Sequence, residues 1–283
     1  MVTDDDMEPL EDSERQRAGR RVIWGDTPNG RRGSMKRAML SMAAAVLAGG
    51  AAACSPSPPE RTASEAQAAR EWARPPVIER VERAGTSLMV SGVADPGARV
   101  VLRGDDGAAF AATADPGGGF DIRVPVPAGH RLLHAETQIG QDAAPAPDRL
   151  LILAAGKGPI AVLRAGGATR RLDPAPVLGA IDSDGHMRLA SGRVPPGTPA
   201  VEIQTGGETV PVVPDAEGRW SVILAPREGT DQVRVGGRDF AWPGEGGASG
   251  DWQVERIGAG WRIRWTGPGG SGQTTWLPDA TAP

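Results

Sequence analysis

The sequence repeats itself at a constant spacing of 100 residues, and this repeat constrains the fold more than any other feature. Four pairs of positions carry the match: Ser91-Gly92 with Ser191-Gly192, Pro96-Gly97 with Pro196-Gly197, Asp115 with Asp215, and Gly118 with Gly218. The recurring positions are those that shape turns and strands, whereas a duplicated active site would repeat its nucleophiles, acids or ligands. The repeat therefore predicts two copies of a β-rich module without repeated chemistry.

Short apolar runs cut by Gly and Pro at intervals of about ten residues begin at Pro75. This spacing predicts an all-β fold made of two tandem β-sandwiches. We expect a first module at 75–174 and a second module at 175–281. Each module is expected to bury its own core and to end in extra strands, near 150–153, 160–164 and 168–172 in the first and near 252–257, 261–266 and 273–277 in the second.

Turn chemistry gives a more local expectation. Gly118 and Gly218 each precede an aromatic residue by two positions, in turns that open with an aspartate. We expect both glycines to adopt a positive φ, which a residue with a Cβ adopts only with strain. Gly246 lies in a Gly-rich stretch and is expected to tolerate alanine.

Two segments resemble a known family. Ser91–Ala98 reads SGVADPGA and Asp215–Val222 reads DAEGRWSV, and both are similar to the signatures of bacterial Ig-like repeat domains. The resemblance implies immunoglobulin-like sandwiches without catalysis, as in surface and envelope modules. It covers about 40 residues of each module. A carboxypeptidase-regulatory-like sandwich would show nearly the same signature.

Residues 35–53 have the order of a lipoprotein signal peptide. Met35-Lys36-Arg37 is basic, and the apolar run that follows is shorter than the roughly 20 residues of a membrane-spanning helix. Small residues then precede Cys54, the only cysteine of the chain. The arrangement resembles the lipobox of bacterial lipoproteins, which implies lipidation of Cys54. Ala51 stands where a lipobox usually has a branched residue, so cleavage by ordinary signal peptidase is the alternative.

The segments around this signal have the composition of unfolded chain. Residues 1–34 are charged and lack apolar periodicity, so we expect disorder there, with Met35 as the true start or with a cytoplasmic tail on a signal anchor. Residues 54–74 are rich in Pro and Ala and are expected to form a tether. Ser55 is not the aspartate associated with inner-membrane retention. We therefore expect an exported, membrane-anchored protein of the outer membrane that faces the periplasm or the surface.

The net charge of the chain and its possible metal ligands limit which partners and cofactors we expect. The formal net charge is −4, and the arginines are spread singly among acids, which predicts no nucleic-acid partner. His130 and His134 are four residues apart, about 13 Å on a strand, which does not favour zinc. Asp182-Ser183-Asp184-Gly185 begins like a calcium loop but lacks the later Glu. We expect a turn there, with a peripheral calcium ion as the alternative, and otherwise no metal, cofactor or catalytic residue.

Tryptophans are concentrated in the second module, which holds six of the eight. Trp265 matches Arg164 and Trp242 matches Asp142 in the repeat, so both positions tolerate a polar residue and are expected to be exposed. An exposed pair could stack on the rings of a carbohydrate or peptidoglycan ligand. This is the alternative to our main expectation, a non-enzymatic, lipid-anchored spacer or adhesion module that binds an unidentified envelope protein or glycan.

Overall fold

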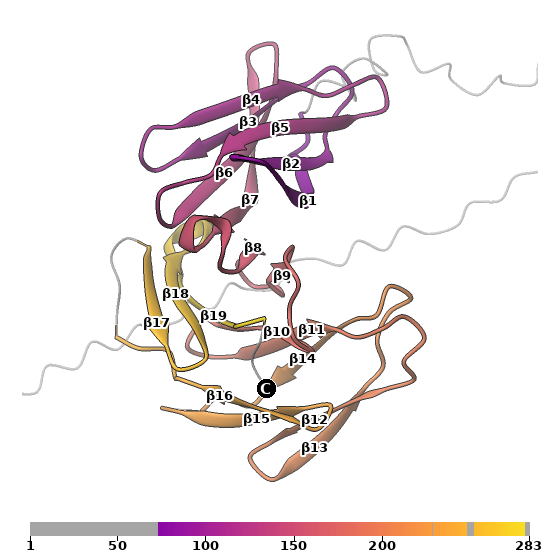
Figure 1. Cartoon of the computed structure of the whole chain (residues 1–283), viewed down its shortest axis with the longest axis vertical. Helices are drawn as coiled ribbons and strands as arrows, with labels where there is room; N and C mark the ends of the chain where they lie inside the picture. The colour runs from indigo at the N-terminus through magenta and orange to yellow at the C-terminus, as the bar shows by residue number, and fades with distance from the viewer. Residues whose placement is uncertain (1–72, 228, 248–251, 281–283) are drawn as a thin grey trace, which may run out of the picture. The chain divides into compact units, whose positions relative to one another are not determined.

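The computed structural model describes residues 73–227, 229–247 and 252–280 (Figure 1). Its regular structure is β-strand apart from two short 3₁₀ turns, Ala154–Gly156 and Pro268–Gly270, which confirms the all-β prediction. No helix in the described residues is long and apolar enough to cross a membrane. The predicted signal peptide, Cys54 and nearly all of the tether lie outside the described residues.

The first module contains two antiparallel sheets. Sheet A has the order β1-β2-β5, formed by β1 (Val77–Ala84), β2 (Ser87–Val93) and β5 (Gly119–Pro125). Sheet B has the order β4-β3-β6-β7-β8-β9. Its strands are β3 (Arg99–Gly104), β4 (Ala109–Thr113), β6 (Arg131–Ile139), β7 (Asp142–Ile152), β8 (Ile160–Leu163) and β9 (Arg170–Arg171).

The second module also contains two antiparallel sheets. Sheet C has the order β14-β11-β10-β19-β18-β17, formed by β10 (Leu178–Ser183), β11 (Arg188–Arg193), β14 (Arg219–Leu224), β17 (Gln253–Ile257), β18 (Gly260–Thr266) and β19 (Gly272–Pro278). Sheet D has the order β13-β12-β15-β16, formed by β12 (Val201–Thr205), β13 (Glu208–Val212), β15 (Asp231–Val235) and β16 (Arg238–Trp242).

The sequence repeat recurs in the strand register. Ile78 lies opposite Gly92 and is followed by a bulge before Arg80, whereas Leu178 lies opposite Gly192 and is followed by a bulge before Ala180. The reason is steric. A Cβ at Gly92 would lie 2.1 Å from the Val77 carbonyl oxygen, and one at Gly192 would lie 2.0 Å from that of Val177. Glycine is therefore required at positions 92 and 192, where the ring of Phe120 or Trp220 also lies close to the backbone.

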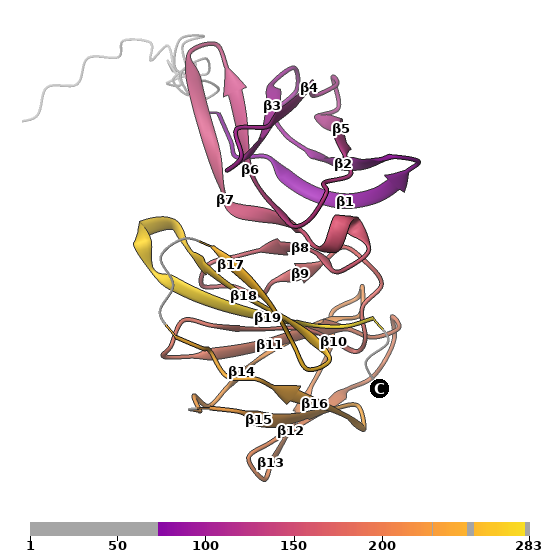
Figure 2. The same ribbon diagram turned by 60° about the vertical axis from the view of Figure 1, so that its left-hand side comes forward.

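The closing strands break the symmetry between the modules. In the first module, β7, β8 and β9 extend the sheet that contains β3 and β6. In the second, β17, β18 and β19 are not part of the equivalent sheet, sheet D. They belong to sheet C, where β19 pairs with β10 and Ile181 lies opposite Trp276 (Figure 2). Closing strands that match each other in the sequence repeat thus belong to sheets that do not correspond between the two modules.

Apolar side chains form three cores. One lies between sheets A and B, and a second lies between sheets C and D. The third joins the modules, because it draws residues from sheets B and C. Its buried members are Leu132, Leu151, Leu153, Ala161, Leu163, Ala180, Ile263, Trp265 and Leu277.

Alternation along β7 and β8 explains how the third core forms. Leu150 and Ile152 face the first core, whereas Leu151 and Leu153 face the third. Strands buried on both faces read as continuous apolar runs rather than as alternating ones. The sequence predicts that each module buries its own core, and the third core is an addition to that prediction.

Candidate binding cleft

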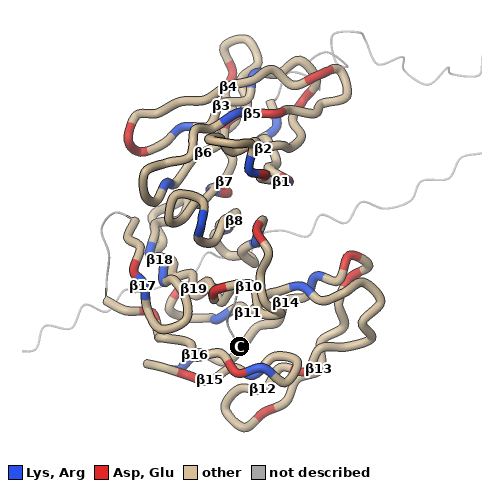
Figure 3. Tube along the Cα trace, viewed as in Figure 1, with Lys and Arg blue, Asp and Glu red and all other residues tan. Residues whose placement is uncertain are grey.

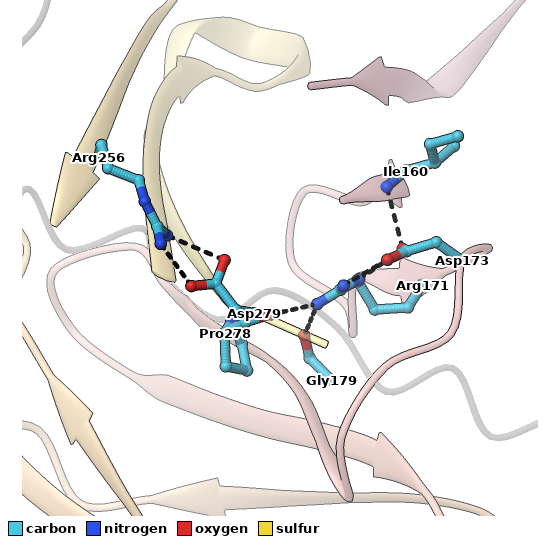
Figure 4. Close-up of polar contacts among 7 residues, drawn as sticks. All are labelled: Ile160, Arg171, Asp173, Gly179, Arg256, Pro278 and Asp279. Atoms are coloured by element: carbon cyan, nitrogen blue, oxygen red, sulfur yellow. Dashed lines mark hydrogen bonds and ion pairs between the residues drawn. The ribbon is translucent and has the colours of Figure 1, made fainter. Parts of the chain in front are cut away.

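Arg171 ties the last strand of the first module to the second module (Figure 4). Its side chain is only 5% exposed and forms an ion pair with Asp173 at 2.6 Å. Nη1 donates to the carbonyl oxygens of Gly179 at 3.1 Å and Pro278 at 2.9 Å. Asp173 in turn accepts a hydrogen bond from the Ile160 amide at 2.9 Å. A buried ion pair whose remaining donors and acceptors are satisfied fixes local geometry, since breaking it would leave a buried charge unpaired.

Asp182 makes the second polar connection between the modules. Its carboxylate accepts hydrogen bonds from the Thr169 amide at 2.8 Å, the Thr169 hydroxyl at 2.6 Å and the Thr275 hydroxyl at 2.7 Å. Burial raises the pKa of Asp182 to about 6, against the lowering effect of the threonine hydrogen bonds. Desolvation therefore outweighs hydrogen bonding at this carboxylate.

Beside this junction lies a cleft with a volume of about 960 Å³. Arginines dominate its polar lining, and only two carboxylates accompany them, those of Glu79 and Asp215. The six arginines are Arg80, Arg164, Arg170, Arg171, Arg193 and Arg219. Figure 3 colours the basic residues along the chain trace. The lining thus contains more guanidinium groups than carboxylates, although the net charge of the chain is negative.

Three sheet edges border the cleft. β1 is an edge strand of sheet A, β9 is an edge strand of sheet B and β14 is an edge strand of sheet C. Each contributes lining residues: Glu79 and Arg80 from β1, Arg170 and Arg171 from β9, and Arg219 to Ser221 from β14. Loops and strand ends that converge on one hollow are common positions for binding residues.

Four of the arginines have carboxylate partners. These ion pairs join Arg80 to Glu82 at 3.1 Å, Arg164 to Asp148 at 2.7 Å, Arg171 to Asp173 at 2.6 Å, and Arg219 to Asp215 at 2.9 Å and to Glu217 at 2.8 Å. The hydrogen bonds that Arg164 donates to Asp148 raise the pKa of Arg164, and the one that Arg219 donates to Asp215 raises the pKa of Arg219. These cations are held in place by their partners.

Arg170 and Arg193 have no carboxylate partner among the described residues. Arg170 donates to the carbonyl oxygens of Ile78 and Glu79, the latter at 3.1 Å. Burial lowers the pKa of the Arg170 guanidinium, and the charges of Arg164 and Arg219 lower it further, against the raising effect of Asp148 and Glu79. The cleft thus holds a half-buried cation under repulsion from its neighbours.

Arg193 lies directly opposite Arg219 in the β11–β14 ladder. Its Nε donates to the Glu217 carbonyl oxygen at 3.1 Å. Like charges directly opposite each other in a sheet destabilise it. The ion pairs of Arg219 with Asp215 and Glu217 offset this repulsion, whereas Arg193 has no such pair among the described residues.

The expectation that Trp242 and Trp265 are exposed is wrong. Trp242 is fully buried in the second core, and Trp265 is 2% exposed in the third core. The Arg149 guanidinium covers the Trp265 ring at 5.4 Å, and the indole N–H donates to Thr275 at 3.2 Å. The comparison with Arg164 failed because β8 and β18 belong to sheets of different kind, so matched positions have different surroundings. Neither indole offers a face for stacking.

The other candidate residues lie apart from the cleft. His130 Nδ1 accepts a hydrogen bond from the Ala154 amide at 3.1 Å, and His134 Nε2 lies 3.1 Å from Asp105. Asp184 closes a turn by accepting hydrogen bonds from the amides of His186 and Met187, both at 2.9 Å. In the described part of the chain, no group of three or more His, Cys, Asp or Glu side chains is placed to hold a metal ion.

The cleft has no signal in the sequence, because its arginines come from six positions spread over 140 residues. Arg170-Arg171 is the only adjacent pair among them, and by itself it indicates nothing more than a polar strand. No protein-family model matches the chain, and no curated protein sequence matches it. The cleft and the export pattern are therefore the two features that bear on function.

Proposed function

We propose that this protein is a lipid-anchored bacterial envelope protein that acts by binding rather than by catalysis. The observation that carries the binding function is the arginine-lined cleft beside the module junction. The pattern of residues 35–54 supports the proposed localisation, with Cys54 as the lipidated residue and the outer membrane as the destination.

The proposal includes two Ig-like modules at 75–174 and 175–281. Equal registers support it, because Gly92 lies opposite Phe120 and Gly192 lies opposite Trp220. Ig-like modules of envelope proteins commonly serve as spacers or interaction modules, and the cleft favours interaction. Carbohydrate stacking on Trp242 and Trp265 finds no support, since both rings are buried.

Replacing Cys54 by alanine tests the membrane anchor. We expect the Cys54→Ala protein to leave the membrane fraction, because an acylated cysteine supplies most of the apolar burial that a polar tether lacks. Globomycin should make unprocessed wild-type protein accumulate. A wild-type protein that is processed normally under globomycin and found soluble would contradict lipidation.

Site-specific photo-crosslinking tests the binding function. A photoreactive amino acid at Ala175, an exposed residue of the cleft lining, should yield envelope adducts in growing cells. The same group at Ala109, an exposed residue of β4 away from the cleft, is the matched control. Adducts that are equally abundant at both positions, or absent at both, would count against a binding site in the cleft.

A further inference from the structure

We infer that the cleft binds a small ligand carrying two or more phosphate or carboxylate groups. The inference rests on the proposed binding function and names the ligand class for that same site. Guanidinium groups present paired N–H donors that match the oxygens of carboxylates and phosphates. Six of them line one hollow, and two of these, Arg170 and Arg193, have no carboxylate partner among the described residues, which favours an anion with more than one charged group.

Unused donors identify where the ligand binds. Arg193 uses only its Nε in a hydrogen bond within the described part of the protein, which leaves both Nη groups for a ligand. Arg170 uses its two Nη groups on backbone carbonyls, and its Nε makes no hydrogen bond to a described residue. Because neither has a carboxylate partner among these residues, a bound oxyanion would not first have to displace one.

Repulsion between the arginines of the cleft also favours an anionic ligand. Arg193 and Arg219 are direct cross-strand neighbours. The charges of Arg164 and Arg219 act on Arg170, and those of Asp148 and Glu79 oppose them without forming an ion pair with it. An anion placed among these groups would relieve repulsion that the protein's own carboxylates leave in place. Binding of an anion would thus offset a cost that the folded protein otherwise bears.

The size and walls of the cleft favour a small ligand over a polymer. Its volume of about 960 Å³ lies within the range of roughly 300–1,000 Å³ that is usual for small-molecule sites. Val162, Leu172 and Trp220 add apolar wall to the charged lining. Nucleic acids bind along extended basic surfaces, whereas this chain has a net charge of −4 and its basic lining is confined to one hollow.

Isothermal titration calorimetry on the purified full chain in detergent tests the inference. The probes are inorganic pyrophosphate and tricarballylate, with acetate at equal ionic strength as the monovalent control. We expect at least one probe to bind more tightly than acetate, and Arg193→Gln to weaken that binding at least about fivefold. Arg234→Gln is the matched control, because Arg234 is an exposed arginine paired with Asp239 outside the cleft, and it should change affinity less than about twofold.

Arg170→Gln provides a second variant from the deeper part of the cleft, and thermal melts show whether it stays folded. The inference holds if pyrophosphate alone binds, which identifies phosphate, if tricarballylate alone binds, which identifies carboxylate, or if both bind. It is overturned if neither binds at about 5 mM, or if Arg234→Gln weakens binding as much as Arg193→Gln. A short oligonucleotide that binds more tightly than both probes, and loses this advantage in Arg193→Gln, would also overturn it.

The failure of this inference is distinguishable from failure of the proposed function. Photo-adducts at Ala175 without binding of either probe would mean that the cleft takes another class of ligand. Binding of a probe to a Cys54→Ala protein that stays in the membrane fraction would mean that the cleft is correct and the anchor is wrong.

Discussion

At the scale of single residues, the repeated glycines are fixed by backbone geometry. Gly118 has a φ of +88° and Gly218 a φ of +78°, which confirms the prediction of positive φ at both positions. A Cβ would also lie 2.6 Å from the Ala94 carbonyl oxygen in the first case and 2.0 Å from that of Val194 in the second. Both conformational strain and a backbone contact exclude a side chain there.

Gly246 does not behave as expected. Its φ is +78°, and an added Cβ would lie 3.0 Å from Cζ of Arg262. The expectation that it tolerates alanine is wrong, because a Gly-rich stretch can still contain a constrained turn. Gly129 is the better control, since a Cβ there meets nothing within 4 Å and its φ is not positive.

We therefore expect Gly118→Ala and Gly218→Ala each to lower the free energy of unfolding by about 1–3 kcal/mol. Gly129→Ala should change it by less than about 0.5 kcal/mol. Urea unfolding followed by tryptophan fluorescence measures the free energy of unfolding of all three variants. Equal shifts for all three variants would show that the repeated glycines are not structural requirements.

The buried carboxylate of Asp182 predicts a pH dependence. Because its pKa in the folded protein is about 6, above the usual 3.8, the folded state binds this proton more tightly than the unfolded state. The resulting stabilisation is fully present below about pH 4 and is lost as the pH rises through about 6. Between pH 5 and pH 7.5 the group should therefore reduce the free energy of unfolding by roughly 1–2 kcal/mol.

Asp182→Asn tests this dependence, because asparagine keeps the shape and cannot titrate. The difference in unfolding free energy between variant and wild type should shift in favour of the variant as the pH rises from 5 to 7.5. Taking this difference at each pH cancels the contribution of other titrating groups. A difference that stays constant with pH would mean that Asp182 does not titrate in this range.

At the scale of elements, β8 is the strand that links two cores. Ile160 and Val162 face the first core, and Ala161 and Leu163 face the third. We expect Leu163→Ala to cost about 2–5 kcal/mol, because it opens a cavity between the modules. Ile223→Ala, in a side chain that is 65% exposed on β14, is the control and should cost little. Similar costs in denaturant unfolding would argue that the third core contributes nothing to stability.

At the scale of the whole molecule, the third core and Arg171 are expected to make the two modules unfold together. Arg171→Ala would leave Asp173 partly buried without its cation and remove two hydrogen bonds to the second module. Loss of one partner of a buried pair costs about 3–5 kcal/mol. Calorimetry should therefore show one unfolding transition for the wild type and two for the variant.

Arg256 gives the matched control for this experiment, because its ion pair with Asp279 lies within the second module and its side chain is 48% exposed (Figure 4). Arg256→Ala should keep a single transition and cost about 1 kcal/mol or less. Two separate transitions in the wild-type protein would mean that the modules are independent, as the sequence analysis expected.

The features that depend on local chemistry can be predicted from the amino-acid sequence alone. Turn glycines such as Gly118 and Gly218 and the spacing of apolar runs predicted the all-β fold and the positions of its strands, because φ preferences and side-chain alternation act within a few residues. The repeat also predicted which strands are equivalent, up to the point where the closing strands begin.

The sheet that each closing strand joins depends on tertiary contacts, and three features follow from this arrangement. Trp265 is buried although its counterpart Arg164 lines the cleft, the third core forms between sheets B and C, and distant arginines such as Arg80 and Arg219 line one cleft. Each depends on contacts between residues far apart in the chain. Such contacts are set by packing and desolvation over whole sheets, which no local pattern in the sequence encodes.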